Sequence, residues 1–152
     1  MRICLPAILL LVVASPVRGH SQCQLTGVWE LVSGKVDGQP YPTGLHQQKF
    51  ITRSHWAWVL RQDTDLKDLK TVADTLAAYR TRAGGRGTYT VQGTTYTEKI
   101  ESFPEPAYEG LSVPFTCRVE GDRFYQTGTF PIMRDGKKVR DQVLEEVYRR
   151  IE

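Results

Sequence analysis

Hydrophobic and polar residues alternate along most of the chain from residue 27 onward. Successive side chains of a β-strand point to opposite faces, so a period of two is typical of antiparallel strands with one buried face. Turn residues, such as Gly121-Asp122 and Asp135-Gly136, separate the alternating segments. The pattern predicts eight strands, over residues 27–33, 49–52, 55–60, 87–91, 95–101, 113–119, 123–130 and 143–151.

One segment, residues 64–82, departs from this alternation. Its apolar side chains recur at spacings of three and four, at Leu66, Leu69, Ala73, Leu76 and Ala77. This spacing predicts an amphipathic helix, with a cap at one of residues 63–65 and a stop at Gly84-Gly85. The helix follows the third predicted strand, and it either caps one mouth of the folded sheet or covers apolar surface there.

Eight consecutive strands with short connections close most economically into an up-and-down barrel, because closure leaves no strand edge unpaired. We therefore predict an all-β fold, an eight-stranded antiparallel barrel with one helix inserted between strands three and four. A sandwich or half-open sheet is the alternative. The interior of an eight-stranded barrel is either filled by side chains or holds one small ligand.

Residues 1–19 have the pattern of a secretory signal peptide. A basic start at Arg2 precedes an apolar run over residues 3–14, and cleavage is expected after Gly19. The run is shorter than the roughly 20 apolar residues of a membrane-spanning helix. We therefore expect residues 20–152 to form a single barrel domain, exported as a secreted or periplasmic protein and not inserted in a membrane.

Export changes the expected chemistry of the cysteines. Cys4 lies in the predicted signal peptide, which leaves Cys23 and Cys117. In an oxidising compartment these two thiols can form a disulfide. The alternative is two unpaired thiols, with Cys117 as a small core residue, and the sequence leaves both open.

Composition and motifs exclude several functions. The 152 residues are 40% hydrophobic and carry a formal net charge of +3. Two of the positively charged residues, Arg2 and Arg18, lie in the predicted signal peptide. The remainder is close to neutral, so no nucleic-acid partner is expected. The three histidines are scattered, and neither a nucleophile elbow nor a phosphate-binding loop is present. We expect no metal and no cofactor.

The residues Gly27-Val28-Trp29 resemble the Gly-x-Trp signature of the lipocalins and their calycin relatives. The resemblance is closest to small exported bacterial lipocalin-like domains, a family of largely unknown function, and extends over residues 52–59, 84–90, 95–98, 119–122 and 145–151. It implies a barrel with a pocket, in which Trp29 closes the floor and Arg150 packs across it. The inserted helix, and the lack of a helix after the last strand, depart from typical lipocalins.

Alternation also predicts which side chains face inward. In strand 95–101 the polar set faces solvent, which turns Tyr96 and Glu98 inward. In the last strand, one of the two alternating sets of side chains, which includes Val143 and Val147, is more apolar. The resemblance instead implies that the other set, which includes Tyr148 and Arg150, faces inward. The candidate ligand-binding residues are Trp56, Trp58, Tyr89, Tyr96, Glu98, Phe115, Phe124, Gln126, Tyr148 and Arg150.

This set is rich in aromatic rings with a few polar groups, which is typical of small-molecule sites. A buried carboxylate needs a partner, and Arg150 is the partner that this set offers Glu98. The leading hypothesis is an exported protein that binds a small, partly apolar or aromatic molecule without covalent chemistry.

Two alternatives stay open. One is an isomerase or lyase in which Glu98 is the general acid or base and Tyr89, Tyr96 or Tyr148 is the hydrogen-bond donor. The other is a filled barrel that binds a protein partner through loops 39–44 and 104–114. The sequence favours binding over catalysis, and it identifies neither the ligand nor the oligomeric state.

Overall fold

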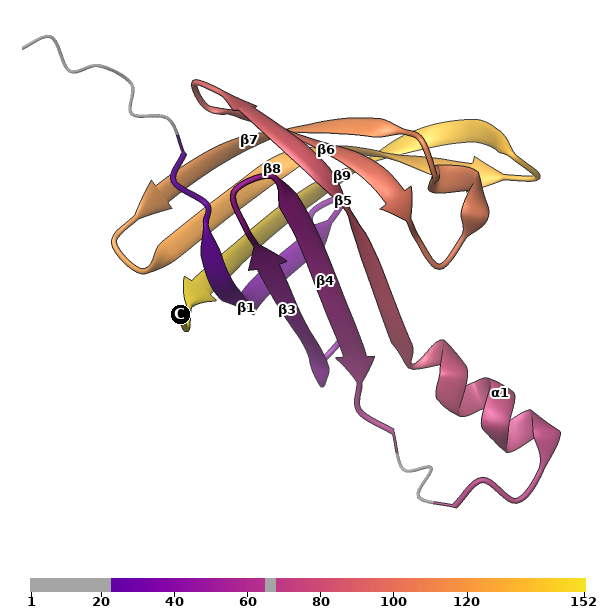
Figure 1. The fold of residues 1–152 in the computed structure, drawn as a ribbon. Helices are drawn as coiled ribbons and strands as arrows, with labels where there is room; N and C mark the ends of the chain where they lie inside the picture. The colour runs from indigo at the N-terminus through magenta and orange to yellow at the C-terminus, as the bar shows by residue number, and fades with distance from the viewer. Residues whose placement is uncertain (1–22, 65–67) are drawn as a thin grey trace, which may run out of the picture.

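A computed structural model describes residues 23–64 and 68–152, so the predicted signal peptide, residues 1–19, lies outside the described residues. The chain folds into a closed antiparallel barrel (Figure 1) with the sheet order β2-β1-β3-β4-β5-β6-β7-β8-β9 and a further pairing between β1 and β9. The eight long strands are β1 (Gly27–Val36), β3 (Leu45–Ile51), β4 (His55–Gln62), β5 (Arg82–Gln92), β6 (Thr95–Ser102), β7 (Ser112–Glu120), β8 (Arg123–Arg134) and β9 (Lys137–Arg150). The predicted fold class is confirmed, including a helix between the third and fourth long strands.

Strand β1 closes the barrel because it pairs on both of its sides. Its first half pairs with β3, over residues 27–30 and 48–51. It pairs with β9 along nearly its whole length, from Trp29 opposite Arg150 to Val36 opposite Leu144. Beyond Glu30, β1 therefore leaves β3 while it continues along β9.

The sequence pattern did not predict β2 (Gln39–Pro40), which has only two residues. It pairs with the end of β1 across the two-residue turn Asp37-Gly38, in which both residues have positive φ. That conformation is the one that an Asp-Gly pair favours in hairpins. The predicted turn at Asp135-Gly136 has the same conformation.

The hairpin of β8 and β9 is longer than predicted, since Pro131 does not end β8. Strand β7 pairs with β8 only as far as Gly128, and beyond that point β9 is the only strand that pairs with β8 in the described chain. A proline is tolerated on such an edge because no neighbour needs its missing N–H. A short 3-10 helix, η1 (Pro106–Tyr108), lies in the loop between β6 and β7.

The helix α1 (Val72–Arg80) is shorter than predicted and begins later. Its N-cap is Thr71, which forms a capping box with Asp74, so the predicted cap at residues 63–65 is wrong. Its C-cap is Thr81, and Gly84 and Gly85 belong to β5 instead of stopping the helix. At Gly87 a Cβ would collide with the Lys99 carbonyl on β6, which explains a glycine within the strand.

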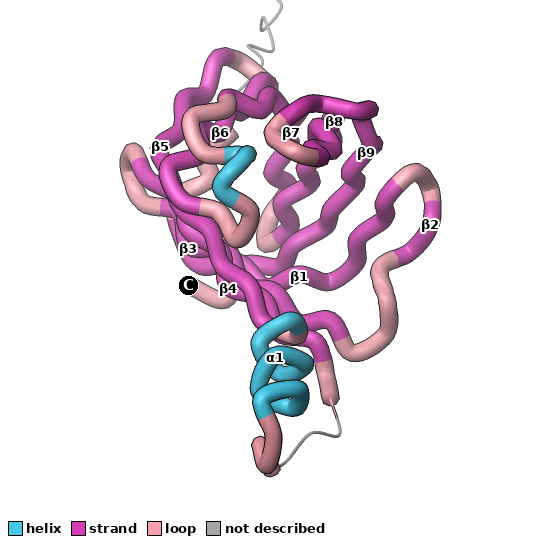
Figure 2. The backbone as a smooth tube through the Cα atoms, turned by 90° about the vertical axis from the view of Figure 1, so that its right-hand side faces the viewer, coloured by secondary structure: helices cyan, strands magenta, loops and turns pink. Residues whose placement is uncertain are grey.

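Both predicted roles of the helix are also wrong. Figure 2 shows α1 beyond the ends of β4 and β5, away from the body of the barrel. Ala78 is its only buried residue, while Val72, Leu76 and Tyr79 are exposed. The described residues contain no helix with the length and apolar character needed to cross a membrane.

Aromatic side chains fill one end of the barrel. Phe124 is in the middle, with ring-centre distances of 5.4 Å to Trp29, 5.4 Å to Tyr148 and 6.2 Å to Tyr96. All four rings are fully buried. The Arg150 guanidinium lies 4.0 Å from the centre of the Trp29 ring and donates a hydrogen bond to the Thr26 carbonyl. This packing closes the end of the barrel where β1 begins and β9 ends.

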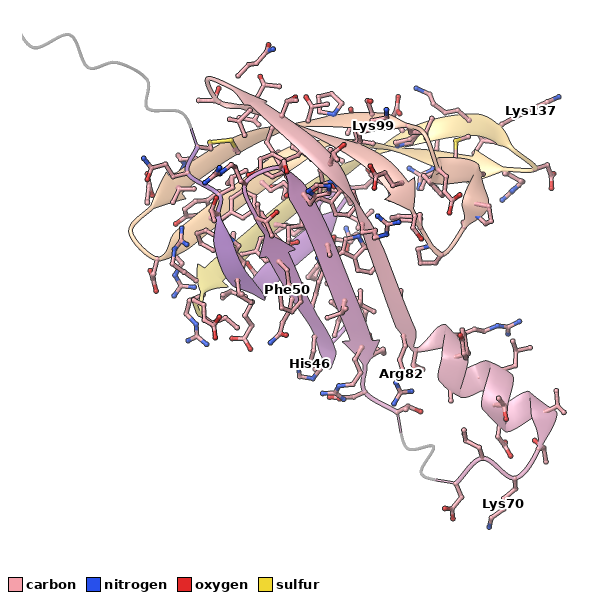
Figure 3. The ribbon with its side chains drawn as sticks, in the orientation of Figure 1. His46, Phe50, Lys70, Arg82, Lys99 and Lys137 are labelled. Atoms are coloured by element: carbon pink, nitrogen blue, oxygen red, sulfur yellow. A yellow bond between two sulfur atoms is a disulfide. The ribbon has the colours of Figure 1, made fainter. Side chains whose placement is uncertain are left out.

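A disulfide joins Cys23 to Cys117 (Figure 3). Cys23 precedes β1, and Cys117 is a buried residue of β7. Of the two alternatives for these thiols, the structure contains the paired one. The bond ties the segment that enters the filled end of the barrel to the opposite wall.

Reduction of this disulfide is expected to lower the free energy of unfolding by about 2–5 kcal/mol, because a long loop becomes free in the unfolded chain. Urea unfolding with and without a reductant measures the change. The double variant Cys23→Ser/Cys117→Ala is the control, since it should not respond to reductant. Equal stability of the oxidised and reduced wild-type protein would contradict the prediction.

Candidate functional site

A cavity of about 210 Å³ occupies the other end of the barrel. Its position follows from the strand register, because Val36 and Leu144 line it and lie far from Trp29 and Arg150 along β1 and β9. The apolar part of the lining is Val36, Trp56, Trp58, Ile100, Phe103, Phe115, Phe130 and Leu144. The polar part is Tyr41, Gln47, Lys49, Glu98, Gln126, Gln142 and Glu146.

A buried ion pair lies in the wall of this cavity. The Lys49 Nζ is 2.8 Å from Glu98 Oε1 and donates a second 2.8 Å hydrogen bond to Gln126 Oε1. Only 2% of Lys49 and 6% of Glu98 is exposed. The ammonium also lies 5.6 Å from the Tyr96 ring centre and 5.5 Å from that of Tyr148, within the range of cation–π attraction.

The predicted pairing of Glu98 with Arg150 is wrong. Arg150 lies at the filled end of the barrel, over the Trp29 ring, and the partner of Glu98 is Lys49. The sequence analysis missed Lys49 because β3 reverses the usual pattern: Phe50 faces outward (Figure 3), and Lys49 is buried. The signal that could have found it is Ile51, because a buried residue at that position turns Lys49 and Gln47 inward by the period of two.

A second polar cluster surrounds Glu146, of which 7% is exposed. Tyr41 donates a 2.8 Å hydrogen bond to Glu146 Oε1, and Tyr148 donates a 2.9 Å bond to Oε2. Gln47 Nε2 donates to the Tyr148 hydroxyl at 2.6 Å. These bonds connect β3, β9 and the loop after β2, and they hold Glu146 with its carboxylate toward the cavity.

Tyr41 reaches this cluster because its ring packs against the backbone of Gly34. A Cβ at Gly34 would collide with the ring, so the close approach requires glycine. Tyr41 therefore bridges the part of β1 that has left β3. The loop at residues 39–44, proposed from sequence as a partner-binding loop, contributes a side chain to the cavity.

The carboxylates of Glu98 and Glu146 affect the pKa values of the tyrosine hydroxyls beside them. Burial first, and then the charge of Glu146, raises the pKa of Tyr41 and of Tyr148 well above the usual value. Burial and the charge of Glu98 do the same to the pKa of Tyr96. The Tyr96 hydroxyl lies near Glu98 outside hydrogen-bonding geometry and has no hydrogen-bond partner in the described chain.

The candidate ligand-binding residues fall into three groups. Those that line the cavity are Trp56, Trp58, Glu98, Phe115 and Gln126. Those that are buried in the core without lining it are Tyr96, Phe124 and Tyr148. The other two, Tyr89 and Arg150, line a separate depression at the filled end. Five polar cavity residues were not among the candidates from sequence: Tyr41, Gln47, Lys49, Gln142 and Glu146.

No protein-family model matches the chain, and no curated protein matches its sequence. In residues 23–64 and 68–152, His, Cys, Asp and Glu side chains do not gather in threes as a metal site would need. The side chains that line the cavity provide one ammonium, two carboxylates, amide groups and a set of aromatic rings.

Lys49→Met is expected to lower the free energy of unfolding by roughly 3–5 kcal/mol, because it leaves the Glu98 charge buried without a partner. Adding Glu98→Gln removes that charge and should restore much of the loss. Lys99→Met, at an exposed position of β6 (Figure 3), is the matched control and should change stability by no more than about 0.5 kcal/mol. Additive effects of the Lys49 and Glu98 substitutions in urea unfolding would contradict this coupling.

Alkaline pH is expected to destabilise the fold through its buried phenols. Tyr41, Tyr96 and Tyr148 have raised pKa values in the folded protein, while the unfolded chain releases these protons near the ordinary value of 10.0. The free energy of unfolding should therefore be unaffected by these groups below pH 10 and fall as the pH rises above it.

Urea unfolding at a series of pH values measures this decline, and Tyr148→Phe should make it shallower. Phenolate absorbance provides the direct comparison. Ionisation of the buried phenols in the folded protein at the same pH as in the urea-unfolded chain would contradict the prediction.

Proposed function

We propose that this protein is an exported, lipocalin-like barrel that binds a small, partly apolar or aromatic molecule in its cavity without covalent chemistry. The observation that carries the proposal is the division of the interior. One end is filled by aromatic rings, while the other leaves about 210 Å³ beside Lys49, Glu98 and Glu146. Costly buried polar groups that line an open volume, instead of packing in the solid core, are typical of ligand recognition.

The size of the cavity limits the ligand. Its volume of about 210 Å³ is below the roughly 300–1,000 Å³ of pockets for drug-sized molecules. Rings of Trp58, Phe103 and Phe130 line the same space as the polar groups. The lining therefore favours a molecule with one apolar or aromatic ring and one polar end.

Two further observations support the rest of the proposal. The disulfide between Cys23 and Cys117 favours an oxidising compartment, in agreement with the signal-peptide pattern at residues 1–19 and with secretion or a periplasmic location. The stacking of Arg150 on Trp29 is the arrangement that the resemblance to lipocalin-like domains of exported bacterial proteins implies.

The two alternatives receive less support. In the isomerase or lyase hypothesis, Tyr89, Tyr96 or Tyr148 donates a hydrogen bond to the substrate, but none of these three tyrosines lines the cavity. Glu98 is also engaged by Lys49. In the filled-barrel hypothesis the interior is only a core, whereas space remains at one end. We therefore favour binding.

Leu144→Trp is expected to abolish binding by filling the cavity, since Leu144 is a half-buried lining residue of β9. Val143→Trp is the matched control, because the neighbouring side chain is exposed on the outer face. A library of single-ring fragments is screened by thermal shift, and dissociation constants of the hits are measured by calorimetry for both variants.

Hits should bind the wild type and Val143→Trp with equal affinity and should lose at least about tenfold in affinity for Leu144→Trp. Screening that finds no hit for the wild type, or hits that bind Leu144→Trp unchanged, would contradict binding in the cavity.

A further inference from the structure

The cavity wall carries more negative than positive charge. Its ionisable lining consists of Lys49, Glu98 and Glu146, apart from the phenol of Tyr41. The single ammonium is engaged, because Lys49 donates to Glu98 and to Gln126 at 2.8 Å each. Glu146 forms no ion pair with any residue of the described chain, and it is 7% exposed.

The hydrogen bonds around Glu146 leave an acceptor position on each of its two carboxylate oxygens. Each carboxylate oxygen has about two acceptor positions, and Oε1 and Oε2 each accept one phenol hydroxyl. Tyr41 and Tyr148 have thereby used the one proton that each can donate. Because Glu146 lines the cavity, a further donor can reach its carboxylate from there.

From these contacts we infer that the ligand carries an ammonium group, which binds Glu146 while its ring packs against the apolar wall. The inference rests on the proposed function and adds the chemical class of the ligand. A charged N–H donor and a carboxylate form a stronger hydrogen bond than neutral groups do. The same group supplies the cation that Glu146 lacks, so that its burial becomes less costly.

The surroundings of Glu146 fit a small aromatic amine. Gln126 lies opposite Glu146 in the register of β8 and β9, and Leu144 lies two residues away on the same face of β9. Trp58 and Phe130 supply aromatic surface to the cavity. The volume of about 210 Å³ favours one ring on a short chain. A ligand carboxylate would instead meet the charges of Glu98 and Glu146.

Three probes with the same ring distinguish these charges: 2-phenylethylamine, the neutral 2-phenylethanol and the anion phenylacetate. Calorimetry with the wild type should show binding of the amine at least about tenfold tighter than of the alcohol, and weakest binding of the anion. Glu146→Gln should remove this preference. Glu145→Gln is the matched control, since Glu145 is the exposed neighbour on β9, and it should leave all three affinities unchanged.

A measurement on the wild type makes the test independent of the variant's folding. The N,N,N-trimethylated amine keeps the charge but has no N–H to donate, so it should bind at least about tenfold more weakly than the primary amine. Equal binding of the amine and the alcohol, preference for phenylacetate, or a preference that survives Glu146→Gln would each overturn the inference, as would a wild type that binds none of the probes.

The test of the ammonium preference can fail without the test of cavity binding failing, so the two results can be distinguished. If fragments bind in the cavity and Leu144→Trp blocks them, but amines have no advantage, the proposed function stands and the ammonium class is wrong. If Leu144→Trp blocks no fragment, the proposed function fails whatever the charge of the probe.

Discussion

The pairing of β1 with β9 is the interaction on which the rest of the structure depends. It joins the first and last long strands of the chain, from Trp29 opposite Arg150 to Val36 opposite Leu144, and so removes the two edges that an open sheet would expose. While β1 follows β9 for this whole length, it leaves β3 beyond Glu30. The loop with Tyr41 covers the place where they separate, and its hydroxyl binds Glu146.

Closure also fixes what the interior can contain. Once the strands form a ring, every second side chain faces inward whatever its chemistry. On β3 this rule buries Gln47 and Lys49 and leaves Phe50 on the outside. A well-packed apolar interior is often as stable as a buried ion pair or more so. The polar inward face of β3 is thus hard to explain by stability alone, which supports a role in recognition.

Sequence reasoning found the fold because it depends on a repeated pattern. Strong alternation and Asp-Gly turns define most strands, and the length of the strand series favours closure. The inward phase of β9 followed from the resemblance and not from hydrophobicity, since Glu146 and Tyr148 are more polar than Val143 and Val147, which lie on the other phase. The late start of α1 was readable, because Thr71 and Asp74 have the spacing of a capping box.

The candidate site was harder to predict for a physical reason. Lys49 and Glu98 are 49 residues apart in the chain, and their contact depends on the register of several intervening strands. No local pattern in the sequence encodes such a contact. From sequence, Arg150 is the one cation in the predicted interior set and hence the one partner that the set offers Glu98. The barrel separates the two along its axis and places Arg150 on the Trp29 ring.

The two ends of the barrel contribute differently to stability. At one end, the rings around Phe124, the stacked Arg150 and the nearby disulfide provide packing and constrain the unfolded chain. At the other end, three ionisable groups are buried beside a cavity, which reduces the apolar area available for stability. A small domain can tolerate that cost when another part of it is well packed and cross-linked. The rigid end then holds the strands whose register brings Lys49, Glu98 and Glu146 to one wall.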